Sequence, residues 1–307
     1  MKAFYSDHFV LPLPTGHRFP MAKYKMLRDL VLGLPNIQLH EAPRASDTEL
    51  LLAHDASYVQ RVISGTLSEA EQKAIGFPWS EKMVERSRRS VGATIAACQS
   101  ALKEGVAVNL AGGTHHAYRN KGSGFCVFND AAIAARVLLK SPIGLQKIGI
   151  LDLDVHQGDG TAAILQNDAA ICTVSIHGEK NYPFAKASSD LDIALADGSS
   201  DTIYLEALEE ALRFLSKQEI QFLIYLAGAD PFEGDRLGRL TLTSEGLALR
   251  DQRVMAFVKD KGIPIAIAMA GGYANPIEDT VRIHYQTIQI ACAHQHTIGV
   301  SKPLSTS

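Results

Sequence analysis

The sequence lacks the features that mark disulfide-bonded, membrane-spanning or nucleic-acid-binding proteins. Its four cysteines show no C-x-x-C spacing and lie in apolar or helical segments, which favours reduced thiols over a disulfide framework or a zinc knuckle. There is no run of about 18 uninterrupted apolar residues and no apolar N-terminal signal region, so we expect no membrane span and predict a cytoplasmic protein. The net charge of −3 contains no basic excess, and we expect no nucleic-acid partner.

Two charged segments are predicted to be ordinary solvent-exposed surface. The most basic one, ERSRRS at 85–90, lies in a helical stretch and is typical of a solvated helix face. The acidic segment at 188–201, SSDLDIALADGSSD, is expected to be an exposed loop. Its carboxylates would alternatively suit the mouth of a site that takes a small amine.

From about residue 105, the sequence alternates regularly between two kinds of segment. Short apolar runs rich in β-branched residues are each followed by a longer amphipathic run. This order predicts a mainly parallel sheet with helices on both faces. A further helix is expected over 81–104, and no linker rich in proline, glycine or serine separates it from the rest. The sequence therefore predicts an open parallel α/β fold in a single domain, residues 1–307.

Four of the predicted strands give way at once to polar or glycine-rich sequence. They end near Gly113, Asp154, Ala227 and Ala270 and lead into GGTHHAY, DVHQGDG, GADPFEGD and GGYANP. In open parallel sheets the carboxyl ends of the strands form the crevice where ligands bind. Residues that are far apart in the chain are therefore expected to meet there.

The stretch LDLDVHQGDG at 151–160 predicts a metal site. Asp152, Asp154 and His156 alternate, which in a strand places them on one face, and burying such groups together is costly without a compensating cation. Asp154, His156 and Asp230 offer two carboxylates and an imidazole, a ligand set suited to Zn²⁺ with a coordination position left open for catalysis. The alternative is that Asp154 and His156 cap the turn and helix that follow.

Two histidines and two carboxylates form a predicted acid–base group. His115 and His116 follow two glycines, and Asp152 and Asp159 flank the proposed metal ligands. A carboxylate that binds one ring nitrogen fixes the histidine tautomer and raises the basicity of the other nitrogen. Tyr273 follows another strand end, where its hydroxyl could donate to a developing oxyanion or simply pack in the core.

Three aromatic residues are candidates for the walls of an apolar slot. Phe125 lies in GSGFCVFND, and Tyr182 and Phe184 lie in NYPF. From spacing alone, each is equally well explained as an ordinary core aromatic.

Taken together, these motifs resemble the histone deacetylase superfamily over residues 4–292. GGTHHA, GSGFCVFNDAAIAA, LDLDVHQGDGT, AGADPFEGDRLG and AGGY occur in the expected order. The resemblance implies the arginase-like α/β fold of that superfamily. DVHQGDG and EGDRLGRLTLTSEGLALRD look more like class IV enzymes and their bacterial relatives than like class I, in which another histidine stands where this chain has Gln157.

The resemblance also implies a role for each motif residue. Zinc, or Fe²⁺ in its place, is expected on Asp154, His156 and Asp230. The tandem histidines match His115 and His116, the second as general base, with Asp152 and Asp159 as their partners. Tyr273 matches the tyrosine that stabilises the transition state. The remaining implied positions are a tunnel wall at Gly124 and Phe125, an opposite wall at Tyr182 or Phe184, and a structural K⁺ bound by Asp152, Ser175 and the carbonyls of Asp154, His156 and Ile176.

By resemblance, the implied activity is that of a zinc-dependent deacetylase. Such an enzyme removes an acetyl or other acyl group from acyl-lysine side chains, using a metal-activated water and a histidine base. Small acetylated amines such as acetylpolyamines, and long-chain fatty-acyl-lysine, are alternative substrates. An arginase-type ureohydrolase would need more aspartates for a second metal ion, and a non-catalytic protein that binds metal or acyl-lysine is a further alternative.

Overall fold

A parallel sheet of eight strands organises the part of the chain that the computed structural model describes, residues 1–295. The strand order is β2-β1-β3-β8-β7-β4-β5-β6, and every neighbouring pair is parallel. The strands are β1 (Lys2–Tyr5), β2 (Gln38–Glu41), β3 (Val106–Asn109), β4 (Ile148–Asp152), β5 (Ile171–Gly178), β6 (Leu191–Leu195), β7 (Phe222–Leu226) and β8 (Ile265–Ala268).

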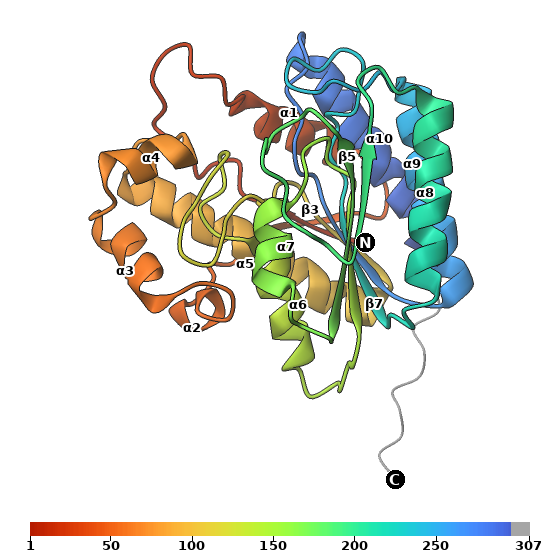
Figure 1. The fold of residues 1–307 in the computed structure, drawn as a ribbon, viewed down its shortest axis with the longest axis horizontal. Coiled ribbons are helices and arrows are strands. Elements are labelled where there is room, and N and C mark those ends of the chain that lie inside the picture. Colours follow the sequence, from red (N-terminus) through yellow and green to blue (C-terminus); the bar gives the residue numbers. More distant parts are fainter. Residues whose placement is uncertain (296–307) are drawn as a thin grey trace.

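Helices cover both faces of this sheet (Figure 1). One face carries α2 (Asp47–Leu50), α3 (Ala56–Ser64), α4 (Glu69–Ile75), α5 (Glu81–Glu104), α6 (Asp130–Leu139) and α7 (Asp159–Leu165). The other face carries α1 (Ala22–Val31), α8 (Asp201–Ser216), α9 (Ser244–Lys261) and α10 (Ile277–His294). The predicted α/β architecture, an open parallel sheet flanked by helices on both sides, is confirmed.

The central strands supply both hydrophobic cores because their side chains alternate between the two faces. In β7, Phe222 and Ile224 pack with the α5 and α6 side, whereas Leu223 and Tyr225 pack with the α8 and α9 side. All five residues of β4 and of β7 are buried, as expected for parallel strands covered on both faces. Their continuous apolar sequences are therefore a consequence of two-sided burial.

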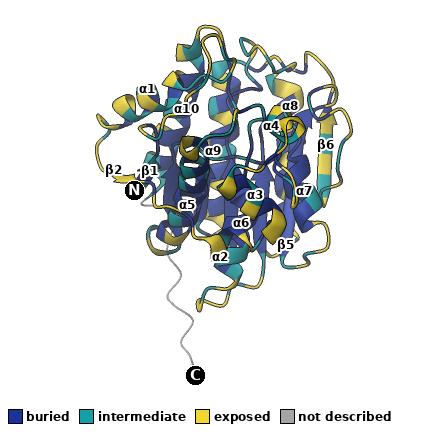
Figure 2. Ribbon diagram, turned by 90° about the vertical axis from the view of Figure 1, so that its left-hand side faces the viewer, coloured by how far each residue is buried: buried dark blue, intermediate teal, exposed yellow. Residues whose placement is uncertain are grey.

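The sequence did not predict the strands at and near the edges of the sheet. β2 is mostly exposed and β6 exposes alternate residues (Figure 2), so neither shows a continuous apolar run. The expectation of a loop over 188–201 is wrong for Leu191–Leu195, which pair with β5 as the edge strand β6. Edge strands have only one neighbour and one well-buried face, which weakens their sequence pattern.

The prediction of a solvated face for residues 85–90 is also wrong in part. Arg86 and Arg88 are buried, with 6% and 2% of their surface exposed. Arg86 donates to the carbonyl oxygens of Ser6, at 2.9 Å, and Phe9, at 3.2 Å, and Arg88 donates to that of Ala45 at 3.0 Å. These arginines satisfy backbone carbonyls of the N-terminal loops, which a helical pattern in α5 cannot reveal.

The structure also bears on the predictions about membrane spans, cysteines and domain organisation. Among the described residues, no helix has both the length and the apolar character needed to cross a membrane. All four cysteines are free, three of them buried and Cys292 partly exposed, as the reduced-thiol prediction requires. The single-domain assignment over 1–307 stays a prediction, and residues 296–307 lie outside the described part of the chain.

The topology brings four loops to one edge of the sheet. β8 lies between β3 and β7, and β4 lies on the other side of β7. Because all these strands are parallel, the segments after β3, β4, β7 and β8 leave the same edge. Those four segments carry the residues singled out in the sequence.

Candidate active site

Asp154, His156 and Asp230 lie together at this edge. Strand β4 ends at Asp152, so strand alternation does not place Asp154 and His156; the turn that follows the strand does. His156 Nδ1 lies 2.9 Å from Asp154 Oδ1 and 3.3 Å from Asp230 Oδ2. One ligand atom from each residue falls within 4.8 Å of the others, so the three predicted metal ligands form a compact donor set.

The charges and hydrogen bonds of this group fit a divalent cation. Within residues 1–295, the buried Asp230 Oδ2 accepts no hydrogen bond. Burial and the nearby charge of Asp154 raise the pKa of Asp230 to about 7. Burial lowers the pKa of His156, but the two carboxylates beside it outweigh this and raise it to about 10. Two crowded carboxylates that favour a cation between them are what a zinc site of this ligand type requires.

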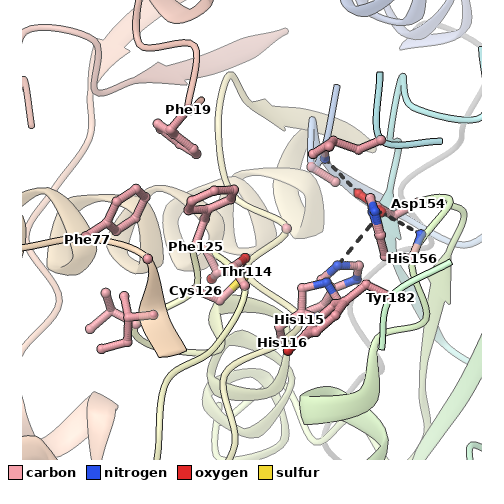
Figure 3. A pocket seen from close by; sticks show the side chains of 18 of the residues that line it. Phe19, Phe77, Thr114, His115, His116, Phe125, Cys126, Asp154, His156 and Tyr182 are labelled. Carbon is pink, nitrogen blue, oxygen red and sulfur yellow. Dashed lines mark hydrogen bonds and ion pairs between the residues drawn. The ribbon is translucent and has the colours of Figure 1, made fainter. Parts of the chain in front are cut away.

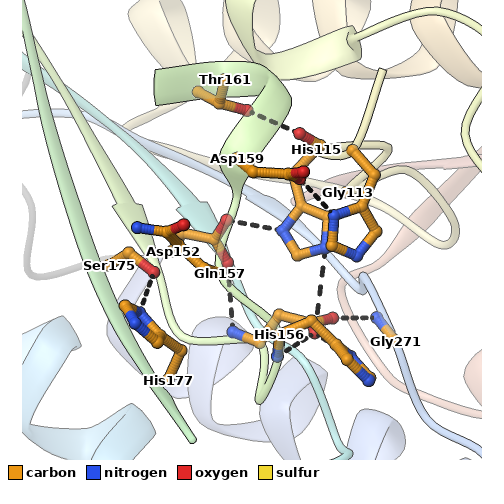
Figure 4. A network of polar contacts seen from close by, with 12 residues as sticks. Gly113, His115, Asp152, His156, Gln157, Asp159, Thr161, Ser175, His177 and Gly271 are labelled. Carbon is orange, nitrogen blue, oxygen red and sulfur yellow. Dashed lines mark hydrogen bonds and ion pairs between the residues drawn. The ribbon is translucent and has the colours of Figure 1, made fainter. Parts of the chain in front are cut away.

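Backbone amides hold the two carboxylates in place. Asp154 accepts from its neighbour His156 N at 2.9 Å through Oδ1, and from Gly271 N at 2.8 Å through Oδ2 (Figure 4). Asp230 Oδ1 accepts from Val155 N at 2.8 Å. These bonds orient the ligands before any cation binds, in the manner of an outer shell around a metal centre.

Each of the tandem histidines is bound to its own carboxylate. His115 Nδ1 lies 2.6 Å from Asp152 Oδ2, and His116 Nδ1 lies 2.6 Å from Asp159 Oδ1. The second oxygen of Asp159 accepts from the Tyr118 hydroxyl at 2.8 Å. Both Nδ1 atoms are thus engaged, which leaves each Nε2 as the atom that can exchange a proton.

The two histidines differ in their protonation. Burial and the charge of His115 lower the pKa of His116 to about 4, against the opposing effect of Asp159. Burial also lowers the pKa of His115, but the charges of Asp152 and Asp154 outweigh it and raise the value to about 9. The lowered pKa favours the neutral form of His116, which can accept a proton, whereas the neighbouring carboxylates favour the protonated form of His115.

Tyr273 lines the same pocket from the loop after β8. Its amide donates to Asp235 Oδ2 at 2.6 Å, and Lys23 Nζ donates to the carbonyl of Gly272 at 3.1 Å. Burial raises the pKa of Tyr273 well above its ordinary value, so the phenol stays protonated and able to donate. The peptide unit between Gly272 and Tyr273 is thus held through both its carbonyl and its amide.

A cavity of about 550 Å³ leads to the predicted metal ligands Asp154 and His156. Phe125 and Tyr182 stand on its walls, and the Tyr182 ring lies edge-on to His116 with 4.8 Å between centroids (Figure 3). Phe184 is 87% exposed and therefore lies at the mouth. Gly124 has φ of +52° and approaches His116 so closely that a Cβ atom would lie 2.7 Å from the ring, so this wall requires glycine.

Two further aromatic rings, Phe19 and Phe77, line the cavity beyond Phe125. Phe19 and Phe77 pack against Phe125 with ring centroids 5.4 and 5.3 Å away (Figure 3). Sequence reasoning missed both, because they lie before α1 and between α4 and α5, in segments without a recognisable motif.

Comparison with known proteins agrees with this geometry. The family model described as histone deacetylase domain matches residues 17–288. The chain belongs to the histone deacetylase family. It is 31% identical to histone deacetylase 2 of Arabidopsis thaliana over 76% of this chain and 62% of that protein. It is 28% identical to the histone deacetylase-like amidohydrolase of Pseudomonas aeruginosa over 86% and 74%, respectively.

Two further comparisons are with an uncharacterized relative and with a solved structure. An uncharacterized protein of Picosynechococcus is 44% identical over 91% of this chain and 94% of its own length. The crystal structure of a histone deacetylase homolog from Aquifex aeolicus has a TM-score of 0.81 at 23% identity, covering 96% of this chain and 84% of that one. Membership of the histone deacetylase family, a family of hydrolases, and its α/β fold are therefore established for this chain.

Gln157, which stands in place of the class I histidine, has a structural role in this family member. Its side chain donates to the Ala187 carbonyl at 2.8 Å and to Asp192 Oδ1 at 2.7 Å, and its Oε1 accepts from Ala187 N at 2.9 Å. The Gln157 side chain thereby connects the turn that carries Asp154 and His156 to Ala187 and to Asp192 of β6. The sequence showed the departure from class I but not these partners.

Of the residues implied as ligands of a monovalent cation, Asp152, Ser175 and Ile176 lie on neighbouring strands, and Asp154 and His156 lie in the turn after β4. Asp152 of β4 is directly opposite Ser175 of β5, and Ile176 follows Ser175. Ser175 Oγ lies 3.0 Å from Nδ1 of the buried His177, a residue that sequence reasoning missed (Figure 4). The K⁺ site stays a prediction.

Proposed function

We propose that this histone deacetylase family member is a zinc-dependent amide hydrolase that removes an acetyl or other acyl group from acyl-lysine side chains. The observation that carries the proposal is the juxtaposition of the Asp154, His156 and Asp230 donor set with two histidine–carboxylate pairs in one cavity. Fe²⁺ would suit the same ligands.

The donor set would hold a zinc ion, and a zinc ion supplies Lewis acidity at an amide carbonyl. His116, neutral and oriented by Asp159, accepts a proton from the attacking water and then returns one to the departing lysine amine. Tyr273, with its protonated phenol, donates a hydrogen bond to the oxygen on which negative charge develops. His115, positively charged and held by Asp152, adds electrostatic stabilisation to the same region.

The volume of the cavity supports a second class of substrate with a longer acyl group. An acetyl group would fill only a small part of the cavity volume of about 550 Å³. Phe19, Phe77 and Phe125 form an apolar surface in the same cavity, next to the predicted metal ligands. Longer acyl chains up to fatty-acyl groups are therefore the alternative to acetyl. The buried free thiols of Cys98, Cys126 and Cys172 suit a reducing compartment, and we place the activity in the cytoplasm.

The test compares zinc-loaded protein with chelator-treated protein on acetyl-lysine and longer acyl-lysine peptides, with acetylputrescine as a small amine. We expect turnover that is lost with the chelator and restored by zinc. Asp154→Ala and Asp230→Ala should abolish both zinc binding and turnover. Stoichiometric zinc without hydrolysis of any substrate would reject the proposal in favour of a protein that only binds.

A further inference from the structure

The exposed part of the cavity wall carries positive charge. Among the described residues that line the cavity, the basic side chains are Arg18, Lys73, Arg86, Lys180 and Arg239. Arg86 is buried, and the other four are exposed. The only acidic side chain on this wall within the described residues is the metal ligand Asp154. We call Arg18, Lys73, Lys180 and Arg239 the rim cations.

Ion pairs leave most of this charge uncompensated. Lys180 and Arg239 share a single carboxylate, Asp197, at 3.9 and 3.1 Å. Arg18 and Lys73 form no ion pair within residues 1–295. The exposed carboxylates Glu69 and Glu179 are near Lys73 and Lys180 in the chain, but neither lines the cavity.

Apart from Asp197, the carboxylates of the acidic segment at 188–201 bind partners away from the rim cations. Asp190 accepts hydrogen bonds from both the amide and the hydroxyl of Thr173, at 2.7 and 3.0 Å. Asp192 accepts from Gln157 and from the amide of Ser189, both at 2.7 Å. These carboxylates hold β6 against the sheet, so they do not offset the rim cations.

The rim cations come from four separate segments. Arg18 precedes α1, Lys73 lies on α4, Lys180 follows β5, and Arg239 lies between β7 and α9. An extended peptide advances about 3.3–3.6 Å per residue, so its residues on either side of an inserted lysine can face several of these segments at once.

We propose that the natural substrate presents its acyl-lysine within an acidic peptide segment, whose carboxylates face the rim cations. The inference rests on the proposed hydrolase function and specifies its substrate class. Charge complementarity of this kind raises the association rate and selects among partners. A peptide with flanking lysines or arginines, or a polyamine with free ammonium groups, would meet like charge at the same place. Phe184, exposed at the mouth, adds an apolar surface for the peptide beside the cations.

The experiment uses zinc-loaded full-length protein and three peptides with one acyl-lysine each, flanked by acidic, neutral or basic residues. At ~0.02 M ionic strength we expect kcat/KM to be about tenfold higher for the acidic than for the basic peptide, mainly through KM. At ~0.5 M salt, where the Debye length is only a few ångströms, the ratio should fall to about two or less.

Charge-reversing variants assign the effect to the rim. Lys73→Glu and Arg18→Glu should each reduce the acidic-over-basic preference about two- to fivefold. Lys140→Glu is the matched control, because this exposed lysine directly follows the C-terminal end of α6, shortly before β4 begins, and so lies at the opposite edge of the sheet from the cavity. The control should keep the preference of the unmodified chain.

The outcomes separate this inference from the hydrolase proposal. Equal turnover of all three peptides, or preference for the basic one, would overturn the inference and leave the hydrolase proposal intact. Faster turnover of a small anionic acetylamide than of the acidic peptide would also overturn it. If no peptide is hydrolysed, the hydrolase proposal fails, and the dissociation constants of the same labelled peptides decide: tighter binding of the acidic peptide supports the inference, and equal binding rejects it.

Discussion

A methyl group at Gly271 would enter the space between the two carboxylates of the proposed zinc site. An ideal Cβ atom there would lie 2.0 Å from Asp230 Oδ2 and 2.5 Å from Asp154 Oδ2. Even a close carbon–oxygen contact is about 3.3 Å. Gly271→Ala therefore requires at least one carboxylate oxygen to move by about 1 Å or more.

Neither carboxylate can make that movement without losing hydrogen bonds. Both aspartates are buried; Asp230 Oδ1 is held by the amide of Val155, and Asp154 Oδ1 by the amide of His156. Metal–ligand distances tolerate only about 0.2 Å, and disturbing an outer-shell group alone weakens metal binding about 10–100-fold. We expect Gly271→Ala to weaken zinc binding by at least about 100-fold.

The measurement is the zinc dissociation constant from competition with a chelator. Gly33→Ala serves as the matched control, because the nearest atom to its added Cβ would be the Leu30 carbonyl oxygen at 3.5 Å. Thermal unfolding without zinc verifies that both variants fold. Zinc affinity in Gly271→Ala equal to that of the control would refute the assignment of Asp154 and Asp230 as ligands on either side of this glycine.

Four further predictions concern catalysis and stability. Tyr273→Phe removes one oxyanion donor and should lower kcat about 10²–10³-fold at unchanged zinc content; an unchanged kcat would contradict the donor role. Asp159→Asn removes the group that orients His116 and should lower kcat about 10²–10⁴-fold, measured under saturating substrate. Because the base must be neutral and the pKa of His116 is lowered to about 4, kcat/KM should be lost only as pH falls below 6.5, and a midpoint above 6.5 would exclude this base. Zinc at about 100 times its dissociation constant should stabilise the fold by about 2.7 kcal/mol in thermal unfolding, whereas an absence of stabilisation would count against a native-state site.

The parallel topology explains why the sequence alone could predict which residues meet at the site. Residues at the carboxyl ends of parallel strands must share one edge, so Asp154 and Asp230 could be brought together without knowing any side-chain contact. The expected strand alternation of Asp152, Asp154 and His156 was a poorer guide, since β4 ends at Asp152. The turn that follows brings Asp154 and His156 together, while Asp152 pairs with His115.

Several of the misses share a physical cause: the decisive partner is distant in sequence and is a backbone atom or an aromatic ring without a motif. Arg86 is buried because it satisfies loop carbonyls about 80 residues away, at Ser6 and Phe9. Lys23 reaches the carbonyl of Gly272 across 249 residues. Such long-range contacts leave no local periodicity, so they become visible only once the chain is folded.

The place of β8 in the sheet has a consequence for how the enzyme is made. In the order β2-β1-β3-β8-β7-β4-β5-β6, strand β8 alone joins the part that carries His115 and His116 to the part that carries the metal ligands. β8 is also the last of the described strands to be synthesised. Until β8 pairs with both β3 and β7, the sheet consists of two separate sets of strands, β2-β1-β3 and β7-β4-β5-β6, and the Tyr273 loop, which follows β8, cannot yet line the cavity.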